Sequence, residues 1–222
     1  MSEAVTSDEV TEPEHPPVPW WGLVSVAAFV GLVVCGYVAT AVAPTWANSH
    51  PVGLLALNAR IRHLLLAIGG GIGFWQYALV AGGRLALAFV VCHLIGRAYS
   101  VRVLNWFGQY LGYRREQMDA LISGFDRVDW AIVPWFTGSN LVAAISGVRR
   151  MNPIRLAVLL TIGLVGRILL YWWIGQVFDD QLADILDWIG RYQWPLTIVS
   201  ILLVLVTVGL NLRRGKAFSG PR

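Results

Sequence analysis

Lysine and acidic residues are scarce in this chain of 222 residues. Lys216 is the one lysine beside 16 arginines, and no aspartate or glutamate occurs between Glu14 and Glu116. The two cysteines, Cys35 and Cys92, lie inside apolar runs. This placement is typical of buried small side chains and excludes a disulfide framework or a cysteine-based metal site.

The motifs of catalysis and nucleotide binding are missing as well. We find no Ser/His/Asp arrangement, no phosphate-binding loop and no zinc motif, and the glycines at 69–71 and 82–83 lack the context of a phosphate loop. An interior poor in acids also offers few general acids or bases. We therefore expect no enzymatic activity, no metal or other cofactor, and no nucleic-acid partner.

Apolar residues are abundant instead. The chain is 56% hydrophobic and 14% charged, with 11 tryptophans. Soluble domains rarely expose so much apolar surface. The sequence therefore predicts an all-α membrane protein that crosses the bilayer several times. The apolar runs long enough to span it are 20–43, 74–95, 154–177 and 195–212.

Both ends of the chain are polar. Residues 1–19 are rich in acids and prolines, and we expect them to form a disordered tail. They lack the basic start of a signal peptide, so 20–43 is expected to be retained as the first span. Residues 213–222 form a basic tail, which leaves 20–212 as the membrane domain.

The segment 128–148 is apolar but interrupted. It contains the stretch VPWFTGSN, in which Pro134 and Gly138 break the helical pattern. Arginines flank the segment at 97, 102, 114, 115 and 127 before it and at 149, 150 and 155 after it. Since cytoplasmic loops carry the excess of arginine, both flanks belong on one side of the membrane. The pattern predicts a re-entrant hairpin with its tip at Pro134 and Gly138; a spanning helix kinked at Pro134 is the alternative.

The segment 51–73 is interrupted in a similar way, by Asn58, Arg60, Arg62 and His63. Two arginines at the centre of a span would cost roughly 5 to 7 kcal/mol. A second re-entrant hairpin with its tip at Asn58 avoids this cost. The alternative is that Arg60 and Arg62 lie in a simple extracellular loop.

Charge also predicts the orientation of the chain. The loop 178–190 holds four aspartates and no arginine, whereas the C-terminal tail is basic. The tail is then cytoplasmic and the acidic loop external. Counting back along the chain puts the N-terminus in the cytoplasm, with the first hairpin entering from outside and the second from inside. We thus expect four transmembrane helices plus two re-entrant hairpins in an inverted repeat, in the plasma (inner) membrane.

Several stretches resemble the DedA family of membrane proteins, which includes the SNARE-associated VTT type. VDWAIVPWFTGSNLVAAISGVRRM, IGLVGRILLYWWIG and RYQWP are similar to the second half of these proteins. SHPVGLLALNARIRHLLL and LIGRAYSVRVLNWFGQYLG are similar to the first hairpin and the linker of actinobacterial members. The resemblance covers about residues 45–210. It implies four spans, two facing hairpins and translocation of a lipid such as undecaprenyl phosphate or a phospholipid.

The chain departs from that family in its charges. Typical members have arginines around the break of the second hairpin and carboxylates in the first, which are thought to couple transport to protons. Here the first hairpin lacks Asp and Glu, and the second break lacks arginine. Asp129 is the one carboxylate placed to serve in proton coupling. The competing interpretation of Asp129 is a helix cap.

Arginines within apolar runs are the strongest chemical signal. Arg84 and Arg167 are flanked on both sides by apolar residues, so each requires a partner. An anionic phosphate suits this need. The alternatives are snorkelling to the interface or binding to the carbonyls at a helix C-terminus. The predicted contacts of a lipid head group are Arg60, Arg62, Arg84, Arg167, Ser139 and Asn140.

Two smaller patterns complete the sequence. Apolar residues at helical spacing over 100–125, with charges between them, predict a helix on the cytoplasmic interface. Those apolar residues are Leu104, Phe107, Leu111, Met118, Leu121, Ile122 and Phe125. His93 is interpreted as a packed histidine.

Two functions remain open at this stage. The first is a lipid transporter in which the hairpin tips and membrane arginines guide a phosphate head group. The second is a non-transporting subunit that has lost the coupling acids and stabilises or regulates another membrane complex. The expected partners are membrane lipids, with either a second copy of the chain or a partner membrane complex.

Overall fold

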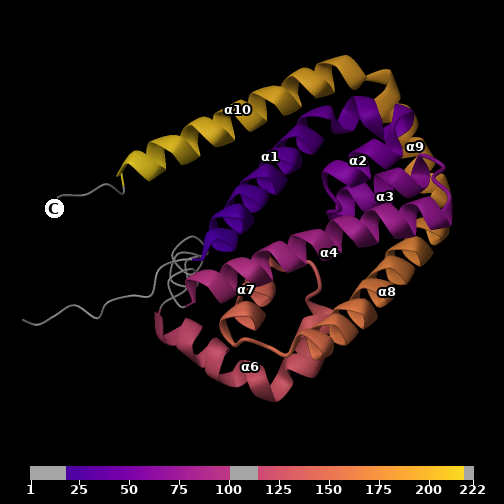
Figure 1. Ribbon diagram of the computed structural model, residues 1–222. Coiled ribbons are helices and arrows are strands. Elements are labelled where there is room, and N and C mark those ends of the chain that lie inside the picture. The colour runs from indigo at the N-terminus through magenta and orange to yellow at the C-terminus, as the bar shows by residue number, and fades with distance from the viewer. Residues whose placement is uncertain (1–18, 101–114, 218–222) are drawn as a thin grey trace, which may run out of the picture.

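The computed structural model describes residues 19–100 and 115–217, and these are almost entirely helical, with no strand among them (Figure 1). The predicted disordered tail and the first part of the predicted interfacial helix, 101–114, lie outside the described residues. The helices are α1 (Trp20–Ser49), α2 (Pro51–Leu57), α3 (Ile61–Gly69), α4 (Phe74–Tyr99), α6 (Arg115–Trp135), α7 (Asn140–Val148), α8 (Pro153–Val177), α9 (Asp179–Arg191) and α10 (Gln193–Ala217).

Three of these helices, α1, α4 and α8, are long and apolar enough to cross a membrane. The bent pair of α9 and α10, which meet at 86°, makes a fourth if it is counted as one span. A helix of 25 residues is about 37 Å long, which exceeds the hydrocarbon thickness of a bilayer. Many of their large apolar side chains are exposed, as expected for surfaces that face lipid. The prediction of an all-α protein is confirmed, and the described residues contain three to four candidate spans where four transmembrane helices were predicted.

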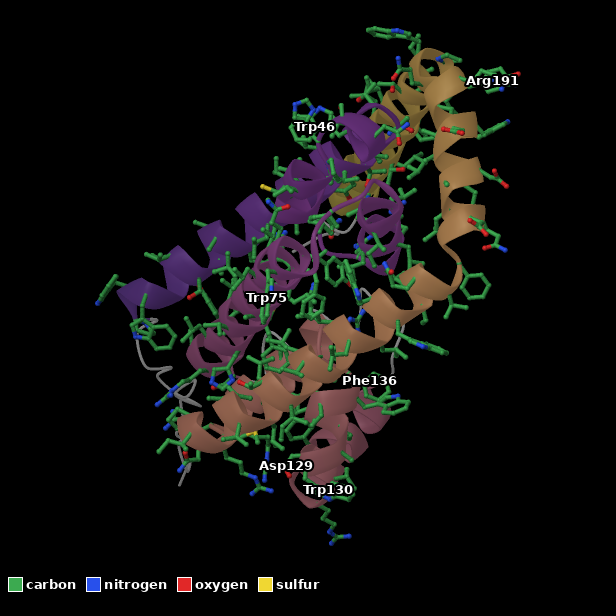
Figure 2. All side chains as sticks on the ribbon, turned by 90° about the vertical axis from the view of Figure 1, so that its right-hand side faces the viewer. Trp46, Trp75, Asp129, Trp130, Phe136 and Arg191 are labelled. Carbon is green, nitrogen blue, oxygen red and sulfur yellow. The ribbon has the colours of Figure 1, made fainter. Side chains whose placement is uncertain are left out.

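The long helices alternate in direction. α1 and α8 run toward α9, and α4 and α10 run away from it (Figure 1). The start of α1 and the end of α10 therefore lie at the same end of the bundle (Figure 1). In Figure 2, Trp46 and Arg191 mark the end that carries α9, which we call the α9 end, while Asp129 and Trp130 lie at the opposite end.

Both interrupted segments form two helices joined by a short break. We call α2 and α3 the first helix pair, with the first break at 58–60, and α6 and α7 the second helix pair, with the second break at 136–139. Breaks were expected at both places. Pro134, which was expected at a hairpin tip, lies instead inside α6, one residue before its end.

The two helix pairs pack at opposite ends of the bundle. At the α9 end, α3 and the first half of α4 share a core with α8, which includes Leu64, Ile68, Tyr77 and Ile168. At the opposite end, α7 shares a core with the second half of α4 and the start of α8, which includes Phe89, Cys92, Ala143, Ile145 and Leu156. Each pair thus contributes to its own core on a shared framework of α4 and α8.

α7 approaches α4 unusually closely because both helices have glycine at the contact. A Cβ atom on Gly96 would collide with the backbone of Ala144, and one on Gly147 would collide with the backbone of His93. Such glycines allow two backbones to pack without side chains between them. The small-residue run of α7 is therefore buried from Val142 to Gly147.

The acidic segment 178–190 was expected to be a loop, and this prediction is wrong. It forms α9, whose Leu182 and Leu186, four residues apart, are buried against Gly69 of α3. The Asn48 side chain of α1 donates a hydrogen bond of 3.1 Å to the Leu186 carbonyl. Aspartates occupy the other faces of this amphipathic helix, which is why composition alone suggested a loop.

Candidate functional site at two helix breaks

The first break faces one side of α1. Leu32, Gly36 and Thr40 are spaced four residues apart and therefore lie on one helical face. A Cβ atom on Gly36 would lie 3.4 Å from the side-chain nitrogen of Asn58, so Gly36 lets the break approach α1. Arg62 Nη2 donates to Thr40 Oγ1 at 2.6 Å.

Arg84 of α4 joins these elements from the other side. Its Nε donates to the Leu57 carbonyl and its Nη2 to the Leu32 carbonyl, each at 3.2 Å. Leu57 is the last residue of α2, where carbonyls have no partner within the helix. A half-buried guanidinium with two fixed donors satisfies one such carbonyl and holds α2 to α1. The contact with Leu57 matches the alternative in which Arg84 binds a carbonyl at a helix C-terminus, whereas Leu32 lies within α1.

The second break is a tight turn. Gly138 has a φ of +106°, a conformation that glycine adopts readily and other residues rarely. Thr137 is fully buried, and its hydroxyl donates to the Val133 carbonyl at 2.8 Å. Gly163 of α8 makes room for the turn, because a Cβ atom there would collide with the Thr137 hydroxyl and lie 2.6 Å from the Pro134 carbonyl oxygen.

Arg167 of α8 holds this second turn. Its Nη1 donates to the Thr137 carbonyl at 2.8 Å, and its guanidinium lies 5.1 Å from the centre of the Tyr171 ring. A Cβ atom on Gly138 would lie 3.5 Å from the guanidinium. The Arg167 Nε is buried and has no hydrogen-bond partner. Arg167 therefore binds the second break in the way that Arg84 binds the first.

Both breaks also present a helix N-terminus. α3 follows Arg60 and α7 follows Ser139, and neither of these N-cap residues makes a side-chain capping bond. The first N–H groups of a helix and its dipole favour negative charge. Arg60 and Asn140 are exposed beside these helix starts, and Ser139 is half-buried. The two breaks thus combine positive helix ends with arginines in a region without carboxylates.

Asp129 lies apart from the two breaks. It is buried within α6 and accepts a hydrogen bond of 2.7 Å from Arg155 Nη2 at the start of α8. Six residues, or about 9 Å of helix, separate it from the end of α6. The interpretation of Asp129 as a helix cap is wrong because the residue lies in the helix interior. Its ion pair joins α6 to α8.

Several polar side chains are buried, and some of them were not recognised from the sequence. His93 is buried as predicted, and its Nδ1 lies 2.9 Å from Ser146 Oγ. Ser146 Oγ donates to the Ala143 carbonyl at 2.7 Å, so it accepts the proton of His93. Tyr77 and His63 are also fully buried. A Tyr or Ser inside an apolar run has no sequence signal that separates a structural role from a binding role.

The described part of the chain shows no cluster of His, Cys, Asp or Glu that would hold a metal ion. Cys35 and Cys92 are free thiols, and Cys92 is buried. Comparison with known proteins found no matching family model, no matching curated protein and no matching solved structure.

Proposed function

We propose that this protein is a membrane lipid transporter of the DedA type, which moves a phosphate-headed lipid across the bilayer. The observation that carries the proposal is the repeated contact between a membrane arginine and a helix break. Arg84 binds a carbonyl 27 residues before it, and Arg167 binds one 30 residues before it. Each half of the chain thus has a helix pair followed by a long helix whose arginine holds the break.

In this proposal the two helix pairs are re-entrant hairpins of an inverted repeat. α3 and α7 have nine residues each, which is about 14 Å of helix and half of the hydrocarbon thickness. The packing of the two pairs at opposite ends of the bundle supports entry from opposite faces. Transporters with such repeats bind substrate where broken helices meet near the midplane.

The chemistry of the breaks fits an anionic head group. Arginine donates to phosphate in a planar fork, and helix N-termini add further N–H donors. Arg60 and Arg62 are exposed at the first break, and Asn140 is exposed at the second. The lipid tails remain against the exposed apolar side chains of the long helices. We place the protein in the plasma (inner) membrane with both termini cytoplasmic.

A transport assay tests the proposal. The protein is reconstituted in vesicles, and the transfer of a fluorescent phosphatidylglycerol between leaflets is followed with a quencher that cannot cross the membrane. Arg60→Gln is the most informative variant because Arg60 is exposed and removing its charge leaves the helix contacts in place. We expect slower transfer at unchanged thermal stability.

Arg191→Gln is the matched control, since Arg191 is also exposed but lies on α9. It should transfer lipid at the wild-type rate. Wild-type protein that transfers no lipid, or equal rates for both variants, would count against a head-group path through the first break.

The second candidate is a non-transporting subunit of a membrane complex. It is favoured by the bonds of Arg84 and Arg167 to backbone carbonyls, since these bonds alone explain why the arginines are tolerated. This function predicts no lipid transfer by the purified chain and the recovery of a partner membrane protein in equal amount.

A further inference from the structure

Three buried side-chain atoms among the described residues have no hydrogen-bond partner. The side-chain atoms are His63 Nδ1, Tyr77 Oη and Arg167 Nε. His63 and Tyr77 are fully buried. Buried polar groups in proteins are almost always paired, so these three exceptions call for an explanation.

The tautomer of His63 follows from its neighbour. Arg62 Nε can only donate, and it lies 3.3 Å from His63 Nε2. His63 Nε2 is therefore the acceptor, and the proton of the neutral ring is on Nδ1. His63 Nδ1 and Arg167 Nε are then donors that require an acceptor, and the Tyr77 hydroxyl can also donate.

Two of these three atoms, Tyr77 Oη and Arg167 Nε, border one stretch of α8, residues 167–172. The Tyr77 ring lies 5.3 Å from the ring of Trp172, and Arg167 lies over Tyr171. Ile68 of α3 contacts α8 at Gly175, and both helices end beside α9. His63 lies on the same helix as Ile68, five residues before it, or about 7.5 Å of helix nearer the first break.

The charge of this region is positive. α3, α4 and α8 contain no aspartate or glutamate, so these helices provide no carboxylate for Arg167. Arg62 adds a second guanidinium beside His63. A ligand for this region must accept hydrogen bonds and carry negative charge, because the region has unpaired donors and guanidinium groups but no acids on these helices. An anion with several acceptor oxygens meets both requirements.

We propose that His63, Tyr77 and Arg167 form an oxyanion site between α3, α4 and α8 that binds a phosphate group. The inference rests on the proposed function, because it names the residues that hold the phosphate of the transported lipid inside the bundle. The three donor atoms have no accessible surface, so the structure shows the site closed.

α3 is the element that opens the site. It is a nine-residue helix bounded by the first break and by the non-helical residues 70–73. It can therefore shift without bending a long helix, whereas movement of α4 or α8 would disturb the whole bundle. Its packing against α8 is apolar and includes Ile68, which lies against Gly175, and Leu64.

Tyr77→Phe removes one donor and keeps the shape of the side chain. The full chain is placed in nanodiscs of phosphatidylcholine with increasing amounts of phosphatidic acid, and unfolding is followed by tryptophan fluorescence. We expect phosphatidic acid to raise the Tm of the wild type, because a ligand that binds the folded state stabilises it. Tyr77→Phe should need about tenfold more phosphatidic acid for the same shift.

Without phosphatidic acid, Tyr77→Phe should be at least as stable as the wild type, since it removes a buried hydroxyl that lacks an acceptor. Tyr37→Phe on α1 is the matched control and should respond like the wild type. The proposal is overturned if Tyr77→Phe also responds like the wild type, or if the wild type does not respond, which would mean that water satisfies the donors.

Inorganic phosphate, titrated into nanodiscs of phosphatidylcholine alone, separates two sources of the anion. If inorganic phosphate raises the Tm of the wild type and Tyr77→Phe reduces this rise, the site binds phosphate itself. If only phosphatidic acid raises the Tm, the site binds a lipid head group. If phosphatidic acid stabilises the wild type but not Tyr77→Phe, and the wild type transfers no lipid, the phosphate site is supported and the transport function is rejected. If the wild type transfers lipid and Tyr77→Phe responds to phosphatidic acid like the wild type, the transport function is supported and the phosphate site is rejected.

Discussion

The guanidinium of Arg167, in the middle of α8, donates a hydrogen bond of 2.8 Å to the carbonyl of Thr137, in the turn between α6 and α7. Thr137 is fully buried, so water does not reach this carbonyl. One side chain therefore satisfies a backbone group that the broken helix leaves without a partner. The corresponding bond from Arg84 to Leu57 gives the first break the same support.

Replacing Arg167 with methionine should destabilise the protein by about 2 kcal/mol, because the buried carbonyl of Thr137 loses its donor. Arg167→Lys should lose about half as much, since an ammonium group can donate one hydrogen bond but does not reproduce the planar stacking on Tyr171. Thermal unfolding in detergent measures both losses. Equal stability of Arg167→Met and the wild type would show that the bond does not hold the turn.

Gly96→Ala should lower the free energy of unfolding by about 3 kcal/mol, because the added methyl group meets the backbone of Ala144 and α7 must move. Gly83→Ala is a control on the same helix, since a Cβ atom there meets nothing within 4 Å. It should stabilise the protein by up to about 1 kcal/mol through helix propensity. Similar unfolding temperatures for the two variants would argue against close packing of α4 and α7.

Gly138→Ala should cost about 1 to 3 kcal/mol, because an alanine at a φ of +106° is strained. Gly166→Ala tests the same substitution at a helical position of α8 where a Cβ atom meets nothing within 4 Å. We expect the first variant to transfer lipid more slowly and the second to match the wild type. If both variants transfer lipid normally and unfold at the wild-type temperature, the turn has another conformation in the membrane.

Asp129→Asn should destabilise the chain through loss of its ion pair with Arg155. The Arg155 side chain is 56% exposed, so solvent screens the pair and its coupling energy should be about 1 kcal/mol or less. A double-mutant cycle with Arg155→Gln measures this coupling. We expect Asp129→Asn and the wild type to respond alike when a proton gradient is applied during the lipid-transfer assay. A response that is present in the wild type and abolished in Asp129→Asn would identify Asp129 as a proton-coupling residue.

Single cysteines in a chain with Cys35 and Cys92 replaced by alanine test whether the second helix pair is re-entrant. Cysteines at Arg127 and Asn152, which flank the pair and are exposed, should react with a thiol reagent from the same side of the membrane. A cysteine at Asp184 on α9 should react from the other side. Labelling of 127 and 152 from opposite sides would make the segment a spanning helix.

The positions of the long helices and of both breaks follow from local properties of the sequence. Apolar runs of about 20 residues or more form helices that suit a membrane, and the predicted starts at 74 and 154 lie within one residue of the starts of α4 and α8. Asn58 and Gly138 interrupt helices through the conformations of their own backbones, which neighbouring residues in the chain largely determine. Burial of His93 also followed from its apolar neighbours.

The partners of the charged groups were decided only by the tertiary structure. Arg84 reaches carbonyls 27 and 52 residues away, and Asp129 pairs with an arginine 26 residues later. Such contacts depend on which helix faces pack together, and the spacing of charges along the chain does not determine that packing. α9 was missed for the same reason. Leu182 and Leu186 are buried on one face of this helix because they pack against Gly69 of α3. The acidic sequence alone favours exposure to solvent, so this helix depends on tertiary packing.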